Sequence, residues 1–124
     1  MKLRLSSDSI RIRVRKSDIE ALRQTGRIAE HILLPDGESF GFALQTDSGG
    51  SAISAYMERE VLTVSLPAAA AGQWMQSEEV GMETSCALPG GTSLLVLVEK
   101  DFPCQHQESS NPEDTFHELL PPQS

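Results

Sequence analysis

The chain has 124 residues, and its 18 Asp and Glu outnumber its 10 Lys and Arg, which leaves a net charge of −8. A chain of this length buries about two-thirds of its unfolded surface on folding, so its core needs neither a metal nor a disulfide. Hydrophobic residues make up 39% and charged residues 23%, which excludes the composition of a disordered chain. No run of 18 apolar residues occurs, and residues 1–6 alternate charge with leucine, unlike a signal peptide. We therefore expect one soluble, cytoplasmic domain with both cysteines reduced.

The first half of the chain predicts two β-hairpins around a short helix. Residues 2–5 alternate basic residues with leucine, and residues 10–15 alternate Ile or Val with Arg, a period that is typical of half-buried strands. Ser17-Asp18-Ile19-Glu20 has the pattern of a capping box, and Gly26 supplies a left-handed end, which predicts a helix over residues 18–25. Residues 27–34 and 39–47 predict the second hairpin, turned by Pro35-Asp36-Gly37.

The second half repeats this order. A shift of 52 residues places Ile10 on Leu62 and Val14 on Leu66, and a shift of 54 places Leu34-Pro35 on Leu88-Pro89. The predicted elements are strands over 51–59, 61–66, 79–88 and 92–100, and a helix over 68–76 that follows Pro67. The match predicts an internal duplication with repeats of about 1–47 and 51–100.

Eight strands and two short helices in this order predict an α+β fold. The helices are too short to form a core of their own and must pack on a sheet, anchored by Ile19, Leu22, Trp74 and Met75. Two pseudo-symmetric β-β-α-β-β repeats fit either an antiparallel sheet or a closed barrel, and periodicity does not choose between the two. We expect a single domain over residues 1–102. Residues 103–124 are acidic and contain proline, and we expect them to form a disordered tail.

Basic residues are concentrated at the start of the chain. Residues 1–16 hold six basic groups and one acid, whereas the remaining 108 hold four basic groups and 17 acids. In the predicted first hairpin one face carries the basic side chains Lys2, Arg4, Arg11, Arg13 and Arg15. Because like charges on one face repel, we expect this face either to be exposed to solvent or to lie near an anionic group. That group would be a carboxylate of the chain's own tail or of a neighbouring strand, or an external anion. The acidic total and only six aromatic residues argue against nucleic acid.

The sequence lacks the usual signatures of catalysis. It contains no glycine-rich phosphate loop, no serine elbow and no His-Glu-x-x-His, and we interpret His31 as a sheet residue rather than a base. Cys104, His106 and His117 are weak candidates for metal ligands, with Asp114 or Glu118 as a fourth, but their spacing matches no standard zinc finger. We therefore predict no cofactor and lean against an enzyme.

Several stretches resemble the motifs of a small uncharacterised bacterial family, a domain of unknown function. They are Ile10-Arg11-x-Arg13-Val14 with Lys16-Ser17-Asp18-Ile19, then Trp74, and Val98-Glu99-Lys100-Asp101-Phe102-x-Cys104. The resemblance covers about residues 2–104 and implies a bacterial, cytoplasmic, single-domain protein without implying an activity. Members end in an acidic tail with an aromatic-Pro motif, whereas here Phe116 is followed by His117.

These observations predict a non-enzymatic binding or protein-interaction module. The candidate binding residues are Arg4, Arg11, Arg13, Arg15, Glu99, Lys100, Asp101 and Cys104. One alternative is a metal-dependent protein or enzyme that uses the Glu99–Cys104 segment and a tail histidine. A second is nucleic-acid or phosphate binding by the basic N-terminal face. We expect a protein or a small anionic ligand as the partner, no membrane, and possible pairing of an edge strand with a second copy.

Overall fold

A computed structural model describes residues 1–101 of the chain. Its elements in chain order are β1 (Lys2–Ser6), β2 (Ser9–Val14), α1 (Lys16–Thr25), β3 (Arg27–Leu33), β4 (Ser39–Asp47), β5 (Ser54–Glu58), β6 (Val61–Pro67), α2 (Ala68–Gln76), β7 (Gly81–Ala87) and β8 (Ser93–Lys100). The predicted order β-β-α-β-β thus occurs twice, and the α+β class is confirmed. The predicted tail, residues 103–124, lies outside the described residues.

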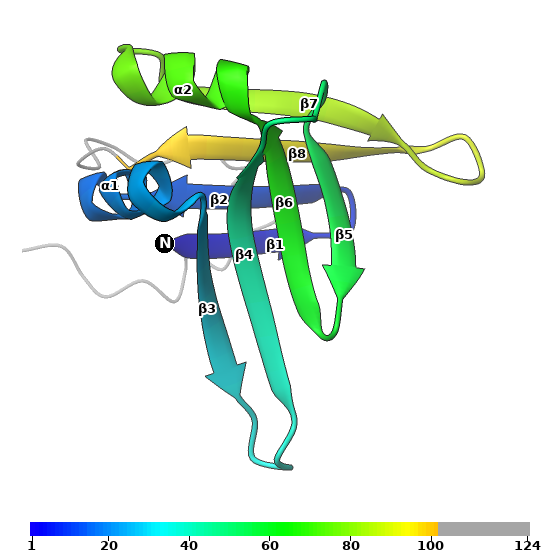
Figure 1. Ribbon diagram of the computed structural model, residues 1–124. Helices are drawn as coiled ribbons and strands as arrows, with labels where there is room; N and C mark the ends of the chain where they lie inside the picture. The colour runs from blue at the N-terminus through cyan, green and yellow to red at the C-terminus, as the bar shows by residue number, and fades with distance from the viewer. Residues whose placement is uncertain (102–124) are drawn as a thin grey trace, which may run out of the picture.

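The eight strands form two four-stranded sheets (Figure 1). Sheet A has the strand order β1-β2-β8-β7, and sheet B has the order β3-β4-β6-β5. Each hairpin is antiparallel, but the central pairs β2–β8 and β4–β6 are parallel. This arrangement differs from both predicted ones, because no barrel closes among residues 1–101 and each sheet joins a hairpin from one half to a hairpin from the other. Alternation along a strand indicates which face it buries, and does not indicate which distant strand it joins.

The two halves pair their strands in the same registers. Leu3 lies opposite Ile12 in β1–β2, and Ala55 lies opposite Val64 in β5–β6, a shift of 52 residues. In the parallel pairs, Ile10 lies opposite Val96 and Leu62 lies opposite Phe42. Leu62 is Ile10 shifted by 52 residues, and Val96 is Phe42 shifted by 54, so the two pairs are equivalent. The halves therefore have equivalent strand pairings, while a duplication of the sequence stays a prediction.

The core lies between the two sheets, whose strands cross one another face to face (Figure 1). Every second residue of the four central strands points into it, as the alternation predicts. The buried core residues are Met1, Ile10, Ile12, Val14, Leu22, Phe42, Leu44, Leu62, Val64, Leu66, Ala71, Trp74, Val96 and Val98. Each large side chain buried in this way contributes about 1.5–3 kcal/mol to folding.

Helix α1 begins two residues earlier than predicted. The carboxylate of Asp18 accepts a hydrogen bond of 2.8 Å from the backbone N–H of Arg15, the residue before the helix. Glu20, predicted to take this role, instead accepts side-chain hydrogen bonds from Arg23 and Gln24 on the exposed surface. The end of the helix at Gly26 is confirmed, with a φ of 81° that favours glycine.

Both helices bury the predicted anchors. Leu22 of α1 and Trp74 of α2 are buried, and Ile19 and Met75 pack against the same core. The indole N–H of Trp74 donates to the carbonyl of Val80 at 3.2 Å, so its polar group is satisfied where α2 leads into β7. The two helices therefore fasten the connections between hairpins to the common core.

Candidate functional site

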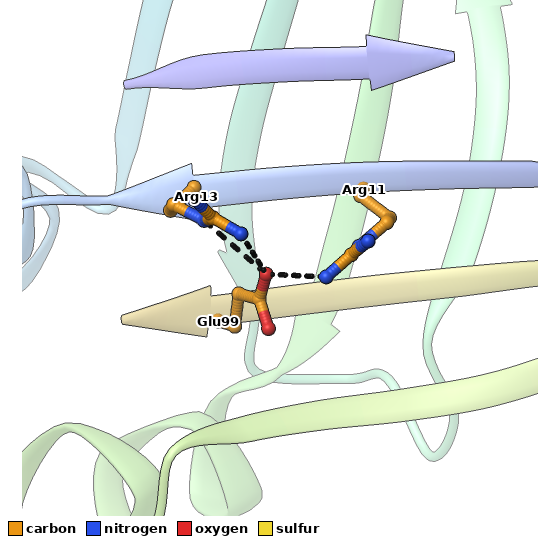
Figure 2. A network of polar contacts seen from close by, with 3 residues as sticks. All are labelled: Arg11, Arg13 and Glu99. Atoms are coloured by element: carbon orange, nitrogen blue, oxygen red, sulfur yellow. Dashed lines mark hydrogen bonds and ion pairs between the residues drawn. The ribbon is translucent and has the colours of Figure 1, made fainter. Parts of the chain in front are cut away.

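Arg11, Arg13 and Glu99 meet on the outer face of sheet A, the face turned away from sheet B (Figure 2). Arg11 Nη2 lies 2.9 Å from Glu99 Oε1, and Arg13 Nη2 lies 3.1 Å from the same oxygen. Arg13 Nε also donates to this oxygen at 3.3 Å. The Glu99 side chain is 15% exposed, and those of Arg11 and Arg13 are 28% and 38% exposed. One carboxylate oxygen thus holds two half-buried guanidinium groups in place.

Parallel pairing of β2 with β8 creates this contact. Arg13 lies opposite Glu99 and Arg11 lies opposite Leu97, so the three charged side chains share one face. On the other side of Glu99 stands Gly81 of β7. A Cβ at Gly81 would lie 2.7 Å from the Val98 carbonyl oxygen and 3.1 Å from the Glu99 Cβ. Glycine is therefore required for β7 to lie this close to β8 beside Glu99.

The basic surface continues onto the edge strand β1. Arg4 lies opposite Arg11, and Lys2 lies opposite Arg13. We call these four residues, Lys2, Arg4, Arg11 and Arg13, the basic stripe. Lys2 and Arg4 are exposed, and neither forms an ion pair with any residue of the described part of the chain. The stripe thus combines two cations held by Glu99 with two that carry no such partner within residues 1–101.

Two leucines border the stripe on the same face. Leu97 lies beside Arg11 and Leu95 lies beside Ser9, and both are half-buried. Beyond them, on β7, stands the exposed Glu83. Across the outer face of sheet A, the basic residues of β1 and β2 are thus followed by Glu99, Leu97 and Leu95 on β8 and by one acid, Glu83, on β7.

Three other predicted binding residues do not join this cluster. Arg15 precedes α1, with its Nε 3.9 Å from Asp18 Oδ2. Lys100 shares a face with the buried Val14, and its ammonium donates to the Ser77 carbonyl at 2.7 Å and lies 5.8 Å from the Trp74 ring centroid. The backbone N–H of Asp101 donates to the Val14 carbonyl at 2.8 Å. Lys100 therefore lies on the opposite face from Glu99, and of the motif Glu99-Lys100-Asp101 only Glu99 forms an ion pair with Arg11 and Arg13 within residues 1–101.

The fourth predicted residue outside the cluster, Cys104, lies outside the described residues. So do the candidate metal ligands His106 and His117. Residues 1–101 bring no three His, Cys, Asp or Glu side chains together in a way that could hold a metal ion.

A second charged site was missed by the sequence analysis. The ammonium group of Met1 is buried and lies 2.9 Å from Asp18 Oδ2 and 3.2 Å from Glu30 Oε2. Burial raises the pKa of Asp18. The hydrogen bond from the Arg15 N–H and the charges of Met1 and Arg15 together lower it by more than burial raises it, so that the pKa lies below the ordinary value of 3.8. The capping pattern that begins at Ser17 obscured the role of Asp18, which caps the helix and binds the ammonium group with the same oxygen.

The equivalent face of sheet B carries no such charge cluster. The register places Thr63 and Ser65 where Arg11 and Arg13 stand, and Gln45 where Glu99 stands. Gln45 Nε2 donates to the Tyr56 hydroxyl at 3.1 Å and to the Ser65 hydroxyl at 3.4 Å, while Arg27 donates to Gln45 Oε1 at 2.7 Å. The same pairing of strands is thus built with a mainly neutral centre, so the fold itself does not require two arginines and a glutamate.

The comparisons with known proteins give a family and no activity. Residues 1–120 match the family of unknown function DUF7009. The chain belongs to this family. The match runs past Asp101, the last described residue, and takes in most of the acidic segment that follows. No curated protein and no solved structure matches the chain. Neither helix within residues 1–101 is long and apolar enough to cross a membrane.

Proposed function

We propose that the chain is a protein-interaction module whose basic stripe binds a partner that presents carboxylates next to apolar side chains. The observation that carries this proposal is the shared contact of Arg11 and Arg13 with one oxygen of Glu99. Each guanidinium has five N–H donors, and the bonds to Glu99 use only one on Arg11 and two on Arg13. The unused donors suit a carboxylate, which pairs with arginine through two parallel hydrogen bonds.

Preorganisation supports the proposal. Binding loses free energy when long side chains must be ordered, by about 0.5–1.5 kcal/mol for each one. Glu99 holds Arg11 and Arg13 in place before any partner arrives. The exposed Arg4 and Lys2 then extend the same row of charges along β1. A partner therefore meets a partly ordered basic surface.

The contrast between the two sheets also supports a function for the charges. Because sheet B keeps the same strand pairing with Gln45 and Ser65 at the equivalent positions, the charges of sheet A are additional to what the fold needs. Half-buried arginines beside Leu95 and Leu97 have the composition of a protein interface, where arginine is enriched and an apolar centre lies within a polar rim.

A protein partner fits this surface better than nucleic acid. Among residues 1–101, the outer face of sheet A has no aromatic side chain on which a base could stack. Outside residues 1–16 the chain has 17 acids and four basic groups, which repel a long polyanion. The metal-dependent alternative stays a prediction, and Glu99, which it would use, is held by two arginines.

Fluorescence anisotropy of the full chain with a labelled peptide of alternating Glu and Leu tests this proposal. We expect binding that weakens as salt is added, because contacts between exposed charges are screened over about 10 Å at 0.1 M salt. The double variant Lys2→Ala, Arg4→Ala should weaken binding by about tenfold, which corresponds to about 1.4 kcal/mol. These two residues are chosen because they form no ion pair within the described residues, so the fold should tolerate their loss.

Arg23→Ala is the matched control, because it removes a positive charge from an exposed helix residue outside the stripe. It should leave binding of the peptide unchanged. The proposal is wrong if the peptide does not bind, or if Arg23→Ala weakens binding as much as Lys2→Ala alone or Arg4→Ala alone does. Tighter binding to oligo(dT) or to inorganic phosphate than to the peptide would replace it with the nucleic-acid or phosphate alternative.

A further inference from the structure

We infer that the acidic segment of residues 102–124 is an internal ligand of the basic stripe and competes with an external partner for it. This inference rests on the proposed function of the stripe, since it names the competitor at the same surface.

The segment starts beside the stripe. The N–H of Asp101 donates to the Val14 carbonyl at 2.8 Å, so the described chain ends against the last residue of β2. In the preceding row of the sheet, Glu99 lies beside Arg13, and Arg13 lies beside Lys2. Lys2 is thus two strands away from β8, or about 10 Å at ordinary strand spacing. The seven residues from 102 to 108 span at most roughly 23 Å when extended, which exceeds this distance. Glu108 is the first acid of the segment, so the connection from Asp101 is long enough for it and for the later acids to reach Lys2.

The charges of the two parts are opposite. Residues 102–124 contain Glu108, Glu113, Asp114 and Glu118 and no Lys or Arg. The stripe contains Lys2 and Arg4, which have no ion pair within residues 1–101. The acids are also accompanied by the apolar residues Phe116, Leu119 and Leu120. Such side chains are suited to pack against the half-buried Leu95 and Leu97. The segment therefore has the same chemistry as the partner proposed above.

Because the segment is covalently attached, even a weak contact is sufficient for it to occupy the stripe. A short flexible connection holds a ligand at an effective concentration of about millimolar, so an acidic segment with modest intrinsic affinity still occupies the stripe. An external partner must then displace it. The family match extends to residue 120 and includes all four acids and the three apolar residues, so these belong to the sequence that defines the family and not to an appendage beyond it.

Two full-length variants of equal charge test the inference. The first neutralises the segment with Glu108→Gln, Glu113→Gln, Asp114→Asn and Glu118→Gln. The second neutralises four exposed acids of the described domain, with Glu58→Gln, Glu60→Gln, Glu78→Gln and Glu79→Gln. Both changes add four to the net charge of −8, so the two variants differ only in where the acids are lost.

The segment variant should bind the Glu-Leu peptide about fivefold to tenfold more tightly than the domain variant at low salt, because its stripe is free. The difference should disappear near 1 M salt, where charges are screened within about 3 Å. Equal affinities of the two variants for the peptide overturn the inference and leave the proposed function intact.

A measurement without the peptide distinguishes failure of the proposed function from failure of the inference about the segment. We expect the NMR signal of the Arg4 side-chain Nε–Hε group to differ between the two variants in the absence of any ligand. If no form of the protein binds the peptide but this signal differs, the proposed function fails while the contact of the segment with the stripe stands. Identical Arg4 signals in the two variants overturn the inference even where the peptide binds.

Discussion

At the scale of single residues, Glu99 decides the character of the outer face of sheet A. It is the one carboxylate in contact with both Arg11 and Arg13 within residues 1–101, and it is less exposed than either. Without it, two guanidinium groups would stand close together and half-buried with unmet hydrogen-bonding capacity. Glu99 thus stabilises the fold and orders the stripe at the same time.

Replacing Glu99 should therefore cost stability. We expect Glu99→Ala to lower the free energy of unfolding by about 1–2 kcal/mol, because hydrogen bonds to charged groups are lost and the two cations repel. Urea titration is the suitable measurement, since urea does not screen charge. The control is Glu83→Ala on the same face, where the exposed carboxylate should change stability by less than about 0.5 kcal/mol. Equal losses in the two variants would show that the Glu99 contacts contribute nothing particular.

Asp18 makes stability depend on pH in the acid range. Its pKa is lower in the folded protein than the ordinary 3.8, despite the opposing effect of burial, because of the Arg15 N–H and the Met1 ammonium. The unfolded chain therefore binds the proton first. The stabilising contribution is complete above about pH 4, near the unfolded value, and is lost as the pH falls through the folded pKa.

Asp18→Asn should remove this part of the pH dependence, because the amide does not titrate. Thermal unfolding midpoints recorded between pH 2 and pH 6 should fall less steeply at the acid end for the variant than for the natural chain. The variant should also be less stable at pH 7, since the ammonium group of Met1 loses an ion pair at 2.9 Å. Parallel curves for the two proteins would contradict the assigned role of Asp18.

At the scale of elements, glycines have different roles in strand and helix. Gly81 in β7 faces the backbone of β8, where a Cβ would lie 2.7 Å from the Val98 carbonyl oxygen. Gly72 lies within α2 and has open space around the position of a Cβ. The strand therefore needs a glycine for close approach, while the helix only loses stability by having one.

Substituting each glycine by alanine should move stability in opposite directions. Gly81→Ala should lower the free energy of unfolding by about 1–3 kcal/mol, because β8 must shift away and take Glu99 with it. Gly72→Ala should raise it by about 0.5–1 kcal/mol, because alanine restricts the unfolded chain and favours helix. Chemical denaturation of both variants checks this pair. A neutral Gly81→Ala would mean that β7 and β8 are less closely held than their register indicates.

At the scale of the whole molecule, the two halves of the chain are interlocked. Sheet A takes β1 and β2 from the first half and β7 and β8 from the second, and sheet B combines the remaining hairpins in the same way. Both parallel central pairs, β2–β8 and β4–β6, join the halves. Either half alone would leave both of its hairpins without their neighbouring strands and would supply only half of each of the two opposing sheets.

Separate halves should consequently fail to fold. We expect residues 1–50 and residues 51–124, each alone, to give the narrow amide NMR spectrum of an unfolded chain, because an isolated hairpin is at best marginally stable. Mixing the two fragments should restore dispersed signals at one-to-one stoichiometry. Cooperative unfolding of residues 1–50 by themselves would instead indicate a half that forms its own core.

The sequence alone determined the local features of this protein. Strands followed from alternation, the end of α1 from Gly26, and the anchors Leu22 and Trp74 from their place on short helices. These features depend on residues a few positions apart in the sequence, because side-chain periodicity and the backbone conformation of single residues determine them. The concentration of basic side chains on one face of the first hairpin was predictable for the same reason.

Only the tertiary structure decided which hairpins share a sheet, and this decision created the candidate site. Arg13 and Glu99 are 86 residues apart, and they meet because β2 joins β8 in one register. The same register turns Lys100 away from the stripe, although it neighbours Glu99 in sequence. Such pairings depend on how two whole sheets bury their apolar faces against each other, a condition that no local pattern of residues expresses.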